Sequence, residues 1–66
     1  MIGTVKWFNA EKGFGFISPE FGDAEAFVHV SQVIAAGLDT LRDGDRIEYT
    51  EENGRRGLRA VNLRLA

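Results

Sequence analysis

Apolar and polar residues alternate along much of this chain, with the two-residue period that is typical of β-strands. The alternation is clearest over residues 46–52, where Ile47 and Tyr49 are flanked by charged or hydroxyl-bearing neighbours. Runs of this kind, bounded by turn residues, predict five strands, at Ile2–Asn9, Gly13–Ser18, Ala24–Val30, Arg46–Glu52 and Arg56–Leu65. A single helical turn is expected over Gln32–Ala35, capped by Ser31, so the pattern indicates an all-β protein.

Turn residues separate the predicted strands and indicate which of them pair. Pro19 to Asp23 contains the proline, glycine and aspartate that favour turns, so it is expected to close a hairpin between the second and third strands. Asn53-Gly54 is a strong signal for a two-residue type I′ turn, because both central positions of that turn need a positive φ. We therefore expect the fourth and fifth strands to form a hairpin around this dipeptide.

Five short strands in 66 residues favour a closed or nearly closed antiparallel barrel in one domain, residues 1–66. A flat sheet of this size would leave two open edges and one uncovered face. The rival fold is a four-stranded sheet covered by two helices. It is disfavoured because no stretch of the chain is long enough to supply either amphipathic helix.

Aromatic residues recur at every second position in the second and third predicted strands. Phe14 and Phe16 share one face of their strand, and Phe27 and His29 share one face of theirs. The alternative is that these rings form the core. In that case Ile17 and other apolar residues, whose side chains point to the opposite face of the strands, would be exposed to solvent. If the two strands are neighbours, the four rings form one exposed platform.

Lysines and further aromatic residues lie close to these rings in the sequence. The segment Lys6-Trp7-Phe8-Asn9 precedes them, and Lys12 is two residues before Phe14. Gly15, between two outward rings, allows another backbone or a flat ligand to approach closely. Open rings that stack on bases, together with cations that contact phosphates, are the features of a surface that binds single-stranded nucleic acid.

Four stretches of the chain resemble the bacterial cold-shock proteins, and together they span nearly its whole length. They are Gly3–Asn9, Glu11–Ile17, Phe27–His29 and the C-terminal pair Asn53–Gly57 with Ala60–Asn62. The resemblance implies a five-stranded barrel of the oligonucleotide-binding (OB) type, which binds single-stranded RNA and DNA with a modest preference for pyrimidine-rich strands. It also implies the role of an RNA chaperone that supports transcription and translation at low temperature.

The resemblance assigns roles to individual residues. The family's stacking residues correspond to Trp7, Phe14, Phe16, Phe27 and His29. Its phosphate and polar contacts correspond to Lys6, Lys12, Asn9 and Arg56, with Arg59 as a further cation and Phe8 as a partly buried ring. Val30 and Leu38 stand where the family usually has Phe, so they offer apolar area without a ring. We expect weaker binding than with the full aromatic set, or a packing role for Val30 against Val33 and Ile34.

Charge is distributed unevenly, although the net charge is only −2. Residues 20–52 contain nine acidic residues and two arginines, whereas residues 53–66 contain four arginines and no acidic residue. This distribution predicts a domain with a neutral to basic side at the aromatic strands and the last hairpin, and an acidic side opposite. It makes a nucleic-acid partner compatible with the acidic total charge.

Composition argues against several other classes of protein. The chain has no cysteine and one histidine, so neither a disulfide, a cysteine-based zinc site nor a histidine pair is expected, and we predict no cofactor and no catalysis. The start of the sequence lacks the features of a secretion signal and no run is long enough to span a membrane, which predicts a cytoplasmic protein. A monomer is expected, with a strand-exchanged dimer as the alternative. Two other functional classes stay open: a barrel that docks a protein on its aromatic face, and a small hydrolase.

Overall fold

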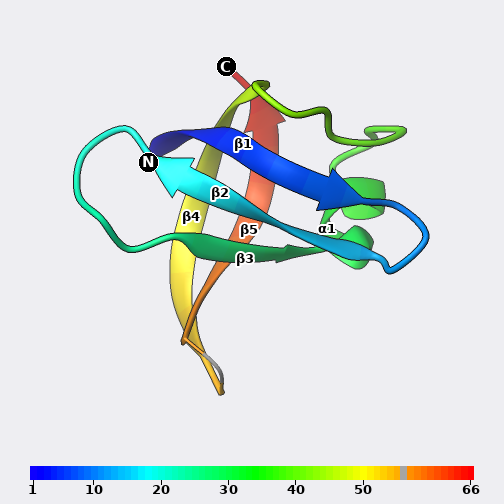
Figure 1. The fold of residues 1–66 in the computed structure, drawn as a ribbon. Helices are drawn as coiled ribbons and strands as arrows, with labels where there is room; N and C mark the ends of the chain where they lie inside the picture. Colours follow the sequence, from blue (N-terminus) through cyan, green and yellow to red (C-terminus); the bar gives the residue numbers. More distant parts are fainter. Residues whose placement is uncertain (56) are drawn as a thin grey trace.

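The part of the chain that the structure describes forms five β-strands and one short helix (Figure 1). The computed structural model describes residues 1–55 and 57–66. The elements are β1 (Ile2–Asn9), β2 (Phe14–Pro19), β3 (Ala26–His29), α1 (Val30–Ala35), β4 (Arg46–Gly54) and β5 (Gly57–Leu65). The predicted all-β class is confirmed, and no helix in the described residues is long and apolar enough to cross a membrane.

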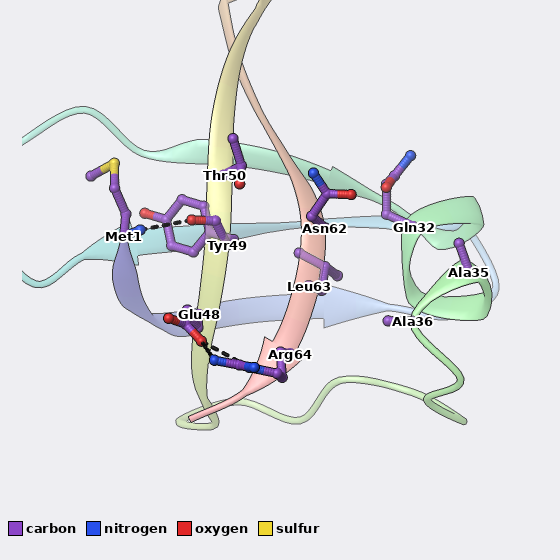
Figure 2. A pocket seen from close by; sticks show the side chains of 10 residues that line it. All are labelled: Met1, Gln32, Ala35, Ala36, Glu48, Tyr49, Thr50, Asn62, Leu63 and Arg64. Carbon is purple, nitrogen blue, oxygen red and sulfur yellow. Dashed lines mark hydrogen bonds and ion pairs between the residues drawn. The ribbon is translucent and has the colours of Figure 1, made fainter.

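The strands close into a barrel in the order β1-β2-β3-β5-β4, which confirms the predicted OB-type architecture. All neighbouring pairs are antiparallel except β3 and β5, which run parallel and share the single register pair Phe27 and Arg59. The predicted antiparallel barrel thus closes through one parallel contact. Met1 extends the contact of β1 with β4, because its amino group donates to the Tyr49 carbonyl at 2.8 Å (Figure 2).

The third strand is shorter than predicted because the chain turns into a helix immediately after His29. Helix α1 starts at Val30, and His29 is its N-terminal cap. The backbone N–H of Ser31 donates to Nδ1 of His29 at 3.1 Å, and the Ser31 hydroxyl lies 2.9 Å from the same nitrogen. The predicted cap at Ser31 is thus wrong by two residues, since the imidazole nitrogen serves as the acceptor.

The hairpin between β4 and β5 also differs from its prediction. Strand β4 continues through Gly54, which pairs with Gly57, so Asn53-Gly54 lies in the ladder and is not the turn. The structure supplies a different reason for the glycine at position 54. A Cβ atom there would lie 2.7 Å from Cδ of Arg59, whose side chain crosses the backbone of β4 at this point.

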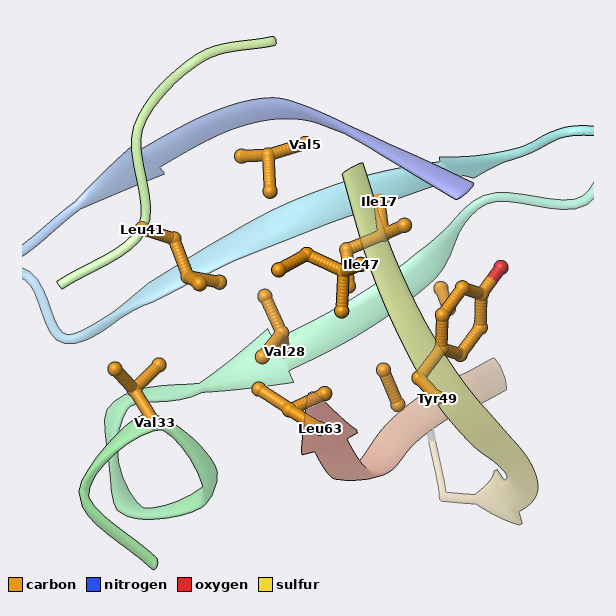
Figure 3. Packing of buried hydrophobic residues seen from close by; sticks show 10 residues of the cluster. Val5, Ile17, Val28, Val33, Leu41, Ile47, Tyr49 and Leu63 are labelled. Carbon is orange, nitrogen blue, oxygen red and sulfur yellow. The ribbon is translucent and has the colours of Figure 1, made fainter. Parts of the chain in front are cut away.

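The core contains the inward-facing residues of all five strands together with one residue of α1 and one of the loop before β4 (Figure 3). Its members are Val5, Ile17, Ala26, Val28, Val33, Leu41, Ile47, Tyr49, Ala60 and Leu63. Ile17 and Val28 are fully buried, as the alternation predicts. The aromatic residues of β2 and β3 therefore point away from the core.

Tyr49 is buried in this core, and its hydroxyl has no hydrogen-bond partner among residues 1–55 and 57–66. Burial raises the pKa of the hydroxyl above its ordinary value of 10.0, and the nearby Glu51 carboxylate raises it further. The folded state thus holds this proton more tightly than the unfolded chain. The stability that this contributes is complete below about pH 10 and is lost as the pH rises through the raised pKa.

We expect Tyr49→Phe to stabilise the fold by about 1 kcal/mol at neutral pH, because it removes a buried hydroxyl without a partner. Urea unfolding of both proteins between pH 7 and 11 measures the effect. The free energy of unfolding of the variant should exceed that of the wild type by a growing amount above about pH 10, where Tyr49 ionises in the unfolded wild-type chain and not in the folded one. A variant less stable than the wild type at pH 7 would contradict the prediction and indicate that the hydroxyl contributes to stability.

Candidate nucleic-acid interface

The outward face of β1, β2 and β3 carries five rings in contact with one another. We call this surface the aromatic platform and define it as Trp7, Phe14, Phe16, Phe27 and His29. Two rows of register partners build it: Trp7, Phe16 and Phe27 in one, and Phe14 and His29 in the other. The sequence prediction that these side chains lie together is confirmed.

Ring contacts hold the aromatic platform in one arrangement. The Trp7 ring meets Phe14 and Phe16 edge-on, with centroids 5.5 and 5.4 Å apart. Phe27 stacks on Phe14 at 5.6 Å, meets Phe16 edge-on at 5.9 Å and lies 6.4 Å from His29. Because each ring supports its neighbours, their outer faces and edges are positioned before any ligand arrives.

Gly15 lies between Phe14 and Phe16 and is buried. A Cβ atom here would lie 2.3 Å from the Trp7 carbonyl oxygen and 2.7 Å from Cα of Phe8. The glycine therefore allows the backbone of β1 to approach β2, which was one of the two reasons predicted for it. It lets Trp7 lie next to Phe14 and Phe16 on the outer face.

Phe8 and Asn9 have different surroundings from the aromatic platform. Phe8 is partly buried and packs against the core, as its family position implies. The side-chain oxygen of Asn9 accepts from the backbone N–H of Lys12 at 2.9 Å, and its carbonyl oxygen accepts from the N–H of Gly13 at 2.8 Å. Asn9 thus orders the turn that joins β1 to β2.

Two cations at the rim are engaged by carboxylates of the acidic middle segment. Lys6 Nζ lies 2.8 Å from Glu25, and the Arg59 guanidinium pairs with Glu52. Glu48 likewise pairs with Arg64. The predicted separation into a basic and an acidic side is therefore wrong, because strand pairing brings acidic side chains of residues 20–52 beside cations of the other segments.

Val30 is the first residue of α1, and Leu38 lies in the loop that follows this helix. Val30 is half-buried and packs against the turn after β1, since a Cβ at Gly13 would lie 3.3 Å from its Cγ1. Its backbone N–H donates to the Gly13 carbonyl at 2.8 Å. Leu38 is half-buried against the core. Both aliphatic side chains thus have intramolecular packing partners.

A groove extends from the aromatic platform to the β4–β5 hairpin. Its lining combines platform rings with hairpin residues: Phe14, Phe16, Phe27, Asn53, Gly54, Arg55, Gly57, Leu58 and Arg59. Arg55 and Leu58 were not among the predicted site residues, although Arg55 lies in the Asn53–Gly57 stretch, because the adjacency of β3 and β5 arises only when the barrel closes. Arg56, a predicted contact, lies outside the described residues.

The chemistry of this surface is that of a binding face. The rings offer π-surfaces to flat ligands, and Arg55 and Arg59 supply cations in the groove beside them. Among the described residues, no group of three or more His, Asp or Glu side chains converges where it could hold a metal ion. The arrangement suits a ligand that is flat, repeating and anionic.

Comparison with known proteins agrees with this geometry. The 'Cold-shock' DNA-binding domain family matches residues 1–66 of the chain. The chain is 50% identical over 62 residues to the major cold shock protein of Micrococcus luteus, covering 94% of this chain and 92% of that protein. It is 52% identical over 61 residues to the major cold shock protein of Streptococcus pyogenes serotype M6, covering 92% and 90% of the two chains. Cold shock-like protein CspA of Vibrio cholerae is 44% identical over 63 residues, covering 96% and 90%.

Proposed function

Because the chain belongs to the cold-shock domain family, whose members bind nucleic acids, we propose that it is a binder of single-stranded RNA and DNA that acts as an RNA chaperone. The observation that carries this proposal is the aromatic platform, whose rings are partly exposed on the barrel surface and adjoin a groove that Arg55 and Arg59 also line. The protein acts in the cytoplasm as a monomer and without catalysis, and it keeps transcripts unpaired for transcription and translation at low temperature.

The mechanism needs no fuel. A protein that binds the unpaired strand and not the duplex shifts the equilibrium toward the unpaired form by mass action. The rings on the outer face of the barrel can stack on unpaired bases. The bases of a duplex stack on each other, so the rings cannot reach their faces. Discrimination between single strand and duplex therefore follows from the shape of the aromatic platform.

Base stacking on the aromatic platform supplies most of the affinity and little sequence specificity. Each stacked base contributes about 1–3 kcal/mol, and every base presents a π-face. A modest preference for pyrimidine-rich strands is the expected outcome, because flexible, weakly self-stacked strands adapt most easily to fixed rings.

The test is a fluorescence titration of Trp7, the single tryptophan of the chain and a member of the aromatic platform. Short oligo-dT, the matching RNA strand and the matching duplex are each added at low and at high salt. The expected result is quenching by the single strands only, which weakens as salt rises because phosphate contacts release counterions. Equal quenching by the duplex, or no response to any strand at high micromolar concentration, would overturn the proposal.

The double substitution Val30→Phe, Leu38→Phe is expected to tighten binding to oligo-dT about three- to tenfold. Each substitution adds a ring at a position where the family usually has Phe, but Leu38 already packs against the core, so the full stacking contribution is not expected from both. The Trp7 titration measures the change. Leu65→Phe, which adds a ring at an exposed aliphatic residue at the end of β5, is the control and should leave affinity unchanged. A double variant that binds no more tightly than this control would contradict the prediction.

A further inference from the structure

One row of register partners crosses all five strands of the barrel. From β1 to β4 it consists of Trp7, Phe16, Phe27, Arg59 and Glu52. Partners in adjacent strands project from the same side of the sheet, so Arg59 and Glu52 continue the face that carries the rings. The aromatic platform therefore ends in an ion pair on the β4–β5 hairpin.

The backbone beneath Arg59 is shaped to hold its side chain. A Cβ atom at Gly54 would lie 2.7, 2.8 and 3.0 Å from Cδ, Cγ and Nε of Arg59, so the side chain lies directly on the glycine backbone. From this position the guanidinium pairs with Glu52. Arg59 also lines the groove that Phe14, Phe16 and Phe27 share with the hairpin.

We propose that Glu52 limits the affinity of this protein for single strands. Its carboxylate pairs with the Arg59 guanidinium at the position where a phosphate of the bound strand would contact that guanidinium. The inference rests on the proposed function and adds a residue that limits it. A phosphate can engage Arg59 only by displacing the Glu52 carboxylate.

The size of the effect follows from the exposure of the pair. The Arg59 and Glu52 side chains are 52% and 45% exposed, so their attraction is that of a surface ion pair. Removing such a competitor is expected to tighten binding about three- to fivefold at low salt. It also frees one more cation for phosphate, which should steepen the dependence of log affinity on log salt by up to about 0.7.

Glu48 provides a matched control for Glu52. It lies on the same strand, is 42% exposed and pairs with an arginine of β5, Arg64. This pair borders a different hollow, next to Met1 and Tyr49 (Figure 2), and none of the platform residues lines that hollow. Glu48→Gln and Glu52→Gln change the net charge equally, so a difference between them reports the position of the carboxylate and not the total charge.

The experiment measures binding of oligo-dT by Trp7 quenching for the wild type, Glu52→Gln and Glu48→Gln, across a series of salt concentrations. We expect Glu52→Gln to bind about three- to fivefold more tightly than Glu48→Gln at low salt and to show the steeper salt dependence. In an Arg59→Gln background the advantage of Glu52→Gln should disappear, because the carboxylate then has no cation to occupy.

Equal affinities of the two variants, with a wild type that binds, would overturn this inference and leave the proposed function intact. An advantage of Glu52→Gln that persists without Arg59 would also overturn it, since the carboxylate would then act by repulsion alone. A wild type that fails to bind any single strand would overturn the proposed function and this inference together. Thermal unfolding monitored by circular dichroism confirms that each variant is folded at the temperature of the titration.

Discussion

Phe27→Ala is expected to weaken the binding of single-stranded oligo-dT roughly ten- to hundredfold. Phe27 lies at the centre of the aromatic platform, in contact with the rings of Phe14, Phe16 and His29. Its removal eliminates one stacking surface, which corresponds to about 1–3 kcal/mol. It also takes away the ring against which the other three are positioned, so the loss should fall in the upper part of that range. Trp7 fluorescence titration at low salt measures the change.

Phe21→Ala is the matched control for Phe27→Ala. Phe21 is 84% exposed, belongs to the loop between β2 and β3, and makes none of the ring contacts of the aromatic platform. The same loss of an aromatic ring should therefore leave the affinity for oligo-dT nearly unchanged. If Phe21→Ala weakened binding as much as Phe27→Ala, the contact surface would have to extend onto that loop. If neither variant weakened the binding of oligo-dT, stacking on the aromatic platform would not be the source of affinity.

Gly15→Ala is expected to reduce the free energy of unfolding by at least about 3 kcal/mol. The added Cβ would meet backbone atoms of β1, at 2.3 Å from the Trp7 carbonyl oxygen and 2.7 Å from Cα of Phe8. Backbone atoms cannot move aside like the end of a side chain, so β1 and β2 must separate along their ladder. The buried core consists of few residues, so the fold has little stability to lose. The urea midpoint at constant temperature measures the effect.

Gly22→Ala separates this steric effect from the general cost of replacing a glycine. Gly22 has a φ of +100°, and no atom lies within 4 Å of the Cβ that alanine would add. Its replacement should cost about 1–2 kcal/mol, which is the price of a left-handed backbone conformation for an L-residue. A urea midpoint for Gly15→Ala no lower than that for Gly22→Ala would contradict the close approach of β1 to β2.

Local alternation explains why so much of the aromatic platform could be predicted. The side chains of Ile17 and Val28 point into the core. Because side chains alternate along a strand, those of Phe14, Phe16 and Phe27 must then face outward. The turn residues between the second and third strands are few, so these two strands pair as neighbours. Periodicity and a short connection together place four of the five rings on one surface.

Other features could not be read from local patterns. The glycine of Asn53-Gly54 was predicted to form a turn, but it lies in the ladder and accommodates the side chain of Arg59. His29 was predicted to stack and also caps α1 through Nδ1. In both cases the residue type suited two roles equally well, and only the position of a neighbouring segment selected between them.

The sequence by itself determined the strands, the inward and outward faces of β1, β2 and β3, and the family to which the chain belongs. These properties follow from side-chain alternation and from motifs that lie within a few residues of one another. The tertiary structure decided the parallel contact of Phe27 with Arg59, the pairing of Arg59 with Glu52, and hence the ion pair at which the aromatic platform ends. The contact of Phe27 with Arg59 joins residues that are distant in sequence, and it forms only because closing the barrel pairs the exposed edge of β3 with β5. The pairing of Arg59 with Glu52 follows from the register of the β4–β5 hairpin, which keeps Asn53-Gly54 in the ladder.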